Sequence, residues 1–330
     1  GGRAGYTGWT GRGGVVWAAM RVVVTGGAGF IGANLCRTLC AAGHEVVVLD
    51  DLSTGSLHNL DWASGAALRL REGTVLDPHH LDDVCDGAHA IVHLAAIGSV
   101  PRSVAAPLPS LAANADGTAQ VLEAARRHGN LHVVVAGSSS VYGANPTLPK
   151  HEQLATRPMS PYAASKLATE AYTLAWGHSY GLPVLAFRFF NVFGPLQSPH
   201  HAYAAVVPRF VDAALRGQPL TIYGDGLQSR DFTYVGTVVG VIADAVQRTV
   251  TSPEPVNLAF GSRVTLLDLV GELEAILGTR LTVHHEPERA GDVRHSQAAN
   301  DSLLALFPGV RPVALVDGLR ATVDWLRSTL

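Results

Sequence analysis

Short apolar runs alternate with helical patterns along the first 190 residues of the chain. The runs are rich in Val and too short for helices: RVVVTG (21–26), EVVVLD (45–50), AIVHLAA (90–96), LHVVVAGS (131–138) and PVLAFRFF (183–190). Helical patterns occupy residues 30–44 and stretches around 107–128 and 161–180. Strands that are apolar on both faces and alternate with helices form a parallel sheet covered on both sides. The pattern predicts a doubly wound, Rossmann-type α/β fold.

The composition of the chain changes after about residue 190. Loops marked by Pro and Gly (GPLQSPHH, YGDG and EPERAGD) separate shorter elements there. We therefore expect a nucleotide-binding domain over 20–190 and a smaller mixed α/β lobe over 191–330. VNLAF (256–260) is predicted to return to the first sheet as an extra strand. Residues 1–19 are Gly-rich and lack periodicity, which favours a disordered leader or an expression remnant.

Bulk composition excludes several functions. The 330 residues are 47% hydrophobic and 15% charged, with a net charge of −3, so no basic surface for nucleic acid is expected. Every apolar run is shorter than a membrane span requires. Three cysteines make a disulfide framework improbable and favour a reducing, cytoplasmic location. Cys36 and Cys40 share a helix face, but no nearby histidine completes a metal site, so no metal is predicted.

A glycine-rich turn, TGGAGFIG (25–32), links the first predicted strand to the first predicted helix. Gly26 suits a tight turn, Gly29 permits close approach of a pyrophosphate, and Gly32 permits close packing of helix and strand. The helix N-terminus then favours the diphosphate. Asp50 ends the second strand at the place where a carboxylate takes ribose hydroxyls, and Asp51 follows it. No arginine nearby suits a 2′-phosphate, so the pattern predicts NAD rather than NADP.

The stretch SPYAASK (160–166) sets a phenol and an ammonium one helical turn apart. Ser160 suits an N-cap and Pro161 the first helical position, so Tyr162 and Lys166 share a face. Alone, such a pair is as compatible with a solvated surface as with a site. A lysine charge roughly 6 Å away, at an effective dielectric of about 20, stabilises a phenolate by on the order of 3 kcal/mol. That lowers the pKa of tyrosine by about two and makes Tyr162 a candidate general base.

Seven motifs occur in a characteristic order: TGGAGFIG, HLAA (93–96), SSSVYG (138–143), SPYAASK, RFFNVFGP (188–195), YGDGLQSRDFTYV (223–235) and RAGDVRHS (289–296). From Met20 to the C-terminus the chain resembles the extended short-chain dehydrogenases/reductases of the NAD-dependent epimerase/dehydratase family. Within it, the chain is similar to the UDP-hexose 4-epimerases. The resemblance implies that Tyr162 removes the proton of the sugar 4-hydroxyl while C4 passes hydride to NAD. The keto sugar then turns over and regains hydride on its other face.

The resemblance also implies which residues contact the ligands. Those expected at NAD are Gly26, Gly29, Phe30, Ile31, Gly32, Asp50, Asp51, Ser53, Thr54, Gly55, Leu94, Ala95, Ala96, Asn114, Tyr162 and Lys166. Those expected at a UDP-sugar are Ser99, Arg102, Ser138, Ser139, Ser140, Asn191, Gln197, Val207, Tyr223, Arg230, Arg289, Asp292 and Ser296. Ser138 matches the hydroxyl that bridges Tyr162 and the sugar, and Arg230 and Arg289 match a diphosphate clamp.

The chain departs from the family pattern at three positions. Thr74 replaces an Asp that contacts adenine, and Gly236 and Thr237 replace an Asp pair. None of these changes removes a group that the reaction requires.

The same motifs bear on the reaction and the substrate. Related dehydratases carry an Asp-Glu pair where this chain has Ser139 and Ser140, and serine is no acid or base near neutral pH. Epimerisation is therefore favoured over a dehydratase or decarboxylase reaction, and over a non-catalytic NAD-binding regulator. Ser296 stands where hexose-restricted relatives have a tyrosine, so the resemblance is closest to the UDP-N-acetylhexosamine-accepting branch. UDP-glucose and UDP-galactose also remain open, as does UDP-glucuronate. The resemblance further implies a homodimer through the helices near 107–128 and 161–180.

Overall fold

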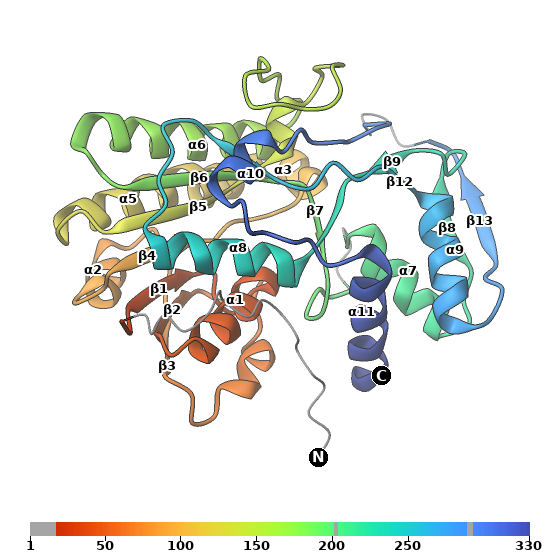
Figure 1. The fold of residues 1–330 in the computed structure, drawn as a ribbon, viewed down its shortest axis with the longest axis horizontal. Helices are drawn as coiled ribbons and strands as arrows, with labels where there is room; N and C mark the ends of the chain where they lie inside the picture. The colour runs from red at the N-terminus through yellow and green to blue at the C-terminus, as the bar shows by residue number, and fades with distance from the viewer. Residues whose placement is uncertain (1–17, 201–203, 289–292) are drawn as a thin grey trace.

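The computed structural model describes residues 18–200, 204–288 and 293–330. The predicted leader therefore lies almost wholly outside the described residues, as do Arg289 and Asp292, which were predicted at the substrate. Figure 1 shows two lobes, a larger one built on a sheet and a smaller one that contains α7, α9 and α11. No helix in the described ranges is both long and apolar enough to cross a membrane.

Seven parallel strands form the central sheet, in the order β11-β6-β5-β4-β1-β2-β3. In chain order these are β1 (Arg21–Thr25), β2 (Glu45–Asp50), β3 (Leu68–Glu72), β4 (Ala90–His93), β5 (His132–Ser138), β6 (Val184–Phe189) and β11 (Val256–Leu258). The order reverses at β1, which pairs with β2 on one side and β4 on the other. The predicted doubly wound fold is confirmed. Strand β3 was not predicted, because its charged residues interrupt the apolar pattern.

Helices cover both faces of this sheet. One face carries α1 (Phe30–Ala41) and α8 (Val235–Arg248), and the other carries α2 (Pro78–Cys85), α5 (Gly117–Arg127) and α6 (Pro161–Tyr180). Alternate residues of β1 enter different cores: Val22 and Val24 pack with α1 and α8, whereas Val23 packs with α2 and α5. Two buried cores, one on each face, explain why the strands read as unbroken apolar runs.

Short helical turns lead toward the carboxyl ends of the strands. They are the 3₁₀ segments η1 (Leu57–Ala63) and η3 (Ser139–Tyr142), the helices α3 (Val100–Ala105) and α4 (Pro107–Leu111), and the π-helical η2 (Ala112–Asp116). A π-helical turn is rare and is often found at functional sites. Here it lies between α4 and α5, and Ala112 and Ala113 line the large cavity described below.

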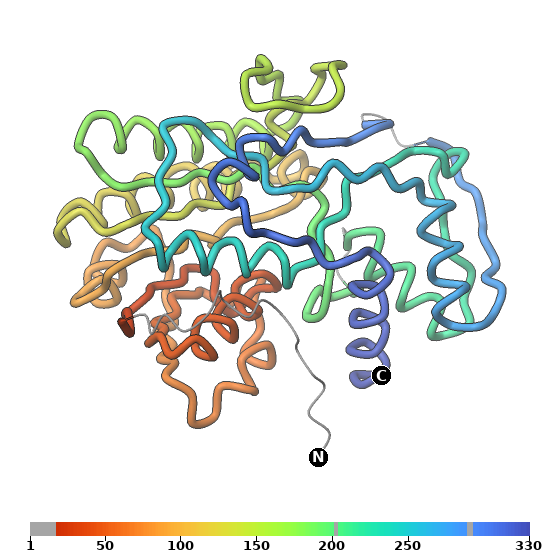
Figure 2. The backbone as a smooth tube through the Cα atoms, viewed as in Figure 1, coloured from red at the N-terminus to blue at the C-terminus, as the bar shows by residue number. Residues whose placement is uncertain are grey.

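The second lobe is assembled from small paired strands and three helices. Its elements are β7 (Asn191–Phe193), α7 (Val206–Leu215), β8 (Leu220–Tyr223), β9 (Ser229–Arg230), β10 (Phe232–Tyr234), β12 (Val264–Thr265), α9 (Leu266–Leu277), β13 (Val283–Glu286) and α11 (Leu315–Thr329). The backbone trace crosses between the lobes more than once (Figure 2). Both α8 and β11 follow residue 190 yet belong to the sheet lobe, and β11 pairs with β6 where a returning strand was predicted. The short α10 (Asp301–Leu306) packs beside β11.

A buried ion pair fastens α6 to the sheet. Arg188 of β6 donates from Nε and Nη2 to the two carboxylate oxygens of Glu170, each at 2.7 Å, and both side chains are buried. The guanidinium also lies 4.7 Å from the ring centroid of Tyr142, whose hydroxyl donates to Asn257 at 2.7 Å. This bidentate, fully enclosed geometry fixes the position of α6, and α6 carries the predicted catalytic residues.

Candidate active site

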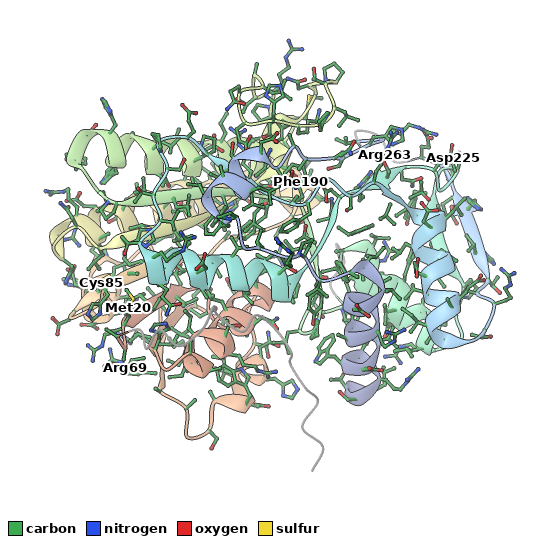
Figure 3. All side chains as sticks on the ribbon, viewed as in Figure 1. Met20, Arg69, Cys85, Phe190, Asp225 and Arg263 are labelled. Carbon is green, nitrogen blue, oxygen red and sulfur yellow. The ribbon has the colours of Figure 1, made fainter. Side chains whose placement is uncertain are left out.

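A cavity of about 1060 Å³ opens at the carboxyl ends of the central strands and extends into the second lobe. Gly26 after β1, Asp50 at the end of β2, Leu94 after β4 and Ser138 at the end of β5 all line it. Phe190, just beyond β6, lines the cavity and lies between the two lobes in Figure 3. The carboxyl edge of a doubly wound sheet, at the point where the strand order reverses, is the usual ligand site of such folds.

The glycine-rich turn is packed too tightly for any side chain at two positions. Gly26 has φ +70°, and a Cβ on it would lie 2.6 Å from the backbone nitrogen of Ala95. A Cβ on Gly32 would lie 2.1 Å from the carbonyl oxygen of Gly26. No side chain caps the start of α1, whose N-cap is Gly29. The first turn of α1 is therefore bare and lines the cavity, an arrangement that fits the pyrophosphate of a dinucleotide.

Asp50 is held by the backbone at the edge of the same cavity. Its two carboxylate oxygens accept from the N–H groups of Ala28, at 2.9 Å, and Leu52, at 2.8 Å. Burial raises the pKa of Asp50, and these two hydrogen bonds act in the opposite direction. Each oxygen keeps a lone pair for a ribose hydroxyl, and the charge disfavours a 2′-phosphate. Thr74 also lines the cavity, but its Oγ1 accepts from the N–H of Leu76 at 3.2 Å.

The catalytic candidates come from β5 and from the first turns of α6. Ser160 accepts from the N–H of Ala163 at 3.1 Å and caps the helix, as predicted from the sequence. The N–H of Tyr162 donates to Ser103 at 3.0 Å, which ties α6 to α3. Lys166 Nζ donates to the carbonyl of Ala136 at 2.8 Å. Tyr162, Lys166 and Ser138 thus line one stretch of the cavity wall.

The ionisation of this group differs from the simple electrostatic expectation. Burial raises the pKa of the Tyr162 phenol, and a hydrogen bond with Ser138 lowers it in part. Burial also lowers the pKa of Lys166 to about 8. The expectation that Lys166 lowers the tyrosine pKa by about two counted one charge and left out desolvation. Without the coenzyme, desolvation outweighs the favourable interactions. That Lys166 and the positive nicotinamide of NAD together bring the pKa of Tyr162 near the working pH stays a prediction.

A buried polar network links the glycine-rich turn to α6. Nδ1 of His93 lies 2.7 Å from the Thr25 hydroxyl, and Nε2 lies 3.1 Å from that of Thr118. Thr118 donates its own proton to the Asn114 carbonyl at 2.5 Å, so it accepts from Nε2–H of His93. The pKa of His93 is lowered to about 3, mainly by burial and to a smaller extent by the charge of Lys166. The network therefore holds a neutral imidazole beside a lysine.

Most residues predicted at the coenzyme line the cavity: Gly26, Gly29, Phe30, Ile31, Gly32, Asp50, Asp51, Ser53, Thr54, Leu94, Ala95, Ala96, Tyr162 and Lys166. Two predicted residues do not line it. Asn114 is buried, and its amide donates to Ser165 at 2.9 Å and exchanges hydrogen bonds with the backbone of Ile97. Gly55 packs behind Asp50 and Ala28. Both positions support the wall without forming its surface.

The residues predicted at the substrate divide in the same way. Those that line the cavity are Ser99, Ser138, Asn191, Gln197, Val207, Tyr223 and Arg230. Arg102 is exposed on α3 and does not line it, and neither do Ser139 and Ser140. Ser296 does not line the cavity either. Its N–H donates at 3.0 Å to the carbonyl of Ser229, which precedes Arg230 in the chain.

Sequence reasoning missed part of the wall. Arg209 of α7, Thr221 of β8 and Gln228 before β9 all line the cavity. Arg209 sits in the apolar run VVPRF, which reads as a core segment. Only the folded packing of α7 against β8 shows that this face of the helix borders a cavity.

A family model matches residues 22–259, and its description is the NAD dependent epimerase/dehydratase family. The chain belongs to this family. NAD is accordingly its coenzyme. As a member with epimerase relatives, the protein is an enzyme of the isomerase class.

Relatives with different sugar substrates resemble the chain to a similar extent. It is 35% identical over 312 residues to the UDP-glucose 4-epimerase of Mycolicibacterium smegmatis, covering 94% of this chain and 99% of the relative. A solved UDP-N-acetylglucosamine 4-epimerase from Methanobrevibacter ruminantium M1, in complex with UDP-N-acetylmuramic acid, superposes with a TM-score of 0.89 at 36% identity and covers 94% of this chain and 99% of its own. The UDP-glucuronic acid 4-epimerase of Bacillus cereus, solved with UDP-glucuronic acid and NAD, gives 0.86 at 28% identity, with 94% and 100% covered.

The close approach at Gly32 predicts that Gly32→Ala releases NAD. The added methyl group clashes with the Gly26 carbonyl, so the turn must open and α1 must shift. We expect the purified variant to hold less than about a tenth of the NAD of the unaltered protein, measured by ultraviolet absorbance after denaturation. Gly271→Ala on α9 is the control, because its Cβ meets nothing within 4 Å. Equal NAD content in both variants would show that the turn tolerates a side chain.

Proposed function

We propose that this enzyme interconverts UDP-sugars that differ in configuration at C4, through a transient 4-keto sugar. The observation that carries the proposal is the meeting of Tyr162, Lys166 and Ser138 in one wall of the cavity that also holds the dinucleotide turn. Binding of both ligands in one cavity brings the sugar carbon within reach of the coenzyme. Such positioning accounts for much of the rate in a reaction of this type.

Each side chain has a distinct task in this reaction. Bound NAD supplies a hydride acceptor that later returns the hydride. Tyr162 takes the proton of the 4-hydroxyl and gives it back after the keto sugar has turned over. Ser138, hydrogen-bonded with Tyr162, holds the sugar oxygen beside the phenol. Lys166, fixed by the carbonyl of Ala136, directs its remaining N–H groups toward the ribose and provides positive charge near the phenolate.

The charges in the cavity wall favour epimerisation over elimination. Among the described residues that line the cavity, the carboxylates are Asp50 and Asp51, both at the coenzyme end. Removal of a C5 proton and expulsion of water require an acid and a base near the sugar. Ser139 and Ser140 cannot supply them, because a serine hydroxyl is neither an acid nor a base near neutral pH. A dehydratase remains the second candidate only through family membership.

The substrate assignment is the finer part of the proposal. We assign UDP-GlcNAc and UDP-GalNAc as substrates, with UDP-Glc and UDP-Gal accepted as well, and UDP-glucuronate as the alternative. The solved N-acetylglucosamine relative supports this assignment. The small side chain at position 296 agrees with it only through the family resemblance, since Ser296 itself does not line the cavity. Gln197 lines the cavity, and its Nε2 donates to the carbonyl of Val192 at 3.2 Å. Its Oε1 has no donor among the described residues, so a turn of the amide group offers an acceptor to an acetamido N–H.

Exposed apolar side chains on the outer helices support a homodimer. Val104, Leu108 and Leu111 on α3 and α4, and Tyr172 and Tyr180 on α6, are 42–73% exposed. Both α3 and α4 pack against α6, so the three helices are neighbours in the fold. We include in the proposal a homodimer through α4 and α6, which lie within the stretches near 107–128 and 161–180 where the resemblance implied one. Sedimentation of the protein at micromolar concentration as a monomer would contradict it.

The reaction is tested by incubating the purified protein with UDP-GlcNAc, UDP-Glc and UDP-glucuronate separately, with no added NAD. We expect the C4 epimer by proton NMR. Tyr162→Phe should lower kcat by about 10³-fold while NAD stays bound. Tyr172→Phe, on the exposed side of the same helix, should leave kcat unchanged. A 4-keto-6-deoxy product would identify a dehydratase, and full activity of Tyr162→Phe would refute the assigned base.

Substrate size is tested at position 296. Ser296→Tyr should reduce turnover of UDP-GlcNAc by at least about 10²-fold and leave UDP-Glc within about threefold, because only the N-acetyl group needs the space. The two kcat/KM values, measured on the same preparation, report the ratio directly. Ser328→Tyr at the C-terminal helix serves as a control for the added bulk. A parallel loss of both substrates would mean that position 296 does not select for size.

A further inference from the structure

One charged side chain in the cavity wall has no partner within the described part of the chain. The charged residues that line the cavity are Asp50, Asp51, Lys166, Arg209 and Arg230. The first three are hydrogen-bonded to backbone or serine groups, and Arg230 donates to the carbonyls of Ser229 and Arg294. The guanidinium of Arg209 makes no hydrogen bond or ion pair with any described residue. Its charge is therefore left for a ligand.

The acid nearest to Arg209 along its own helix is already engaged. Asp212, one turn later on α7, accepts from Nε of Arg216 at 2.9 Å. The first turn of α7, without an acid, presents Val206, Val207 and Arg209 to the cavity. Arg209 is half-buried, and a guanidinium removed from water without a counter-charge is unfavourable. An anion bound in the cavity removes that cost.

The position of α7 indicates which anion this is. The helix packs against β8, whose Thr221 and Tyr223 line the cavity, and neither element belongs to the central sheet. The reacting sugar carbon must lie near Tyr162 on α6, at the other lobe. We propose that Arg209 binds the diphosphate of the nucleotide sugar, in addition to Arg230 and to the Arg289 predicted from the sequence, and so selects nucleoside diphosphates over less charged nucleotides. This inference rests on the proposed function, since it assumes that the cavity takes a UDP-sugar.

Two guanidinium groups suit a diphosphate better than one. Each planar fork donates two parallel N–H groups, and the two phosphates together present enough oxygens for both forks. A carboxylate on the sugar is the other anion that a substrate of this class can carry. Only the diphosphate is common to all the UDP-sugars under consideration, so the two sources make different predictions for UDP itself.

The experiment measures dissociation constants of UDP, UMP, uridine and UDP-glucuronate by calorimetry, using the holoenzyme. We expect Arg209→Met to weaken UDP binding at least tenfold, UMP binding by less, and uridine binding not at all. Arg209→Lys should recover most of the UDP affinity. The matched control is Arg216→Met, which removes an arginine of the same helix region that is paired with Asp212 outside the cavity wall. NAD content, measured in every variant, shows that the fold is intact.

Three results overturn the inference. In the first, Arg209→Met binds UDP as tightly as the unaltered enzyme does. In the second, only UDP-glucuronate binding weakens, which assigns the arginine to a sugar carboxylate. In the third, uridine and UDP weaken equally, which assigns it to the base or to general packing of the wall. If the unaltered holoenzyme does not bind UDP, the proposed function itself is refuted. The calorimetric measurement on the unaltered holoenzyme distinguishes this result from the three above.

Discussion

The proposed chemistry depends on one buried ammonium group. Lys166 reaches the end of β5 and donates to the carbonyl of Ala136 at 2.8 Å, which fixes the rotation of α6 about its axis. Tyr162, one turn earlier, is thereby set beside Ser138 in the cavity wall. The same burial opposes charge on both groups, since it raises the pKa of Tyr162 and lowers that of Lys166 to about 8. A further positive charge in the cavity lowers the pKa values of both groups, and oxidised nicotinamide carries such a charge.

The neutral imidazole of His93 explains how this arrangement is maintained without a competing charge. The ring accepts from Thr25, the first residue of the glycine-rich turn, and donates to Thr118. Thr118 contacts Asn114 and Thr169, and Thr169 belongs to α6. The Thr25 hydroxyl also accepts from the N–H of Ala95 at 3.3 Å, and the Asn114 carbonyl accepts from both Thr118 and Thr169. A protonated His93 would repel Lys166. Coenzyme turn and catalytic helix are therefore connected by polar contacts that leave the net charge of the site unchanged.

Local patterns in the sequence are sufficient for six of the seven strands of the central sheet and for the dinucleotide turn. Apolar runs mark strands that are buried on both faces, and Gly32 is needed because its neighbour lies 2.1 Å from where a Cβ would be. Strand β3 (LRLRE) was not predicted, because it lies at the edge of the sheet and alternates polar and apolar residues. The family resemblance put Asn114 at the coenzyme, whereas its hydrogen bonds with Ile97 and Ser165, 17 and 51 residues away, could be found only in the folded structure. The desolvation of Tyr162 could not be predicted from the sequence either, because burial depends on the packing of several elements around the cavity.

The distribution of charge along the cavity sorts its two ligands. Within the described wall, Asp50 and Asp51 lie at the end of β2, whereas Arg209 and Arg230 belong to the second lobe. Ribose hydroxyls are donors that suit carboxylates, and a diphosphate suits guanidinium groups, so each ligand has one favourable end. In the proposed reaction, the diphosphate stays bound in the second lobe while the sugar ring rotates near Tyr162. That separation matters physically, because a 4-keto sugar must present both faces to the same hydride position without leaving the enzyme. An anchor distant from the reacting carbon permits that rotation, whereas an anchor on the sugar would oppose it.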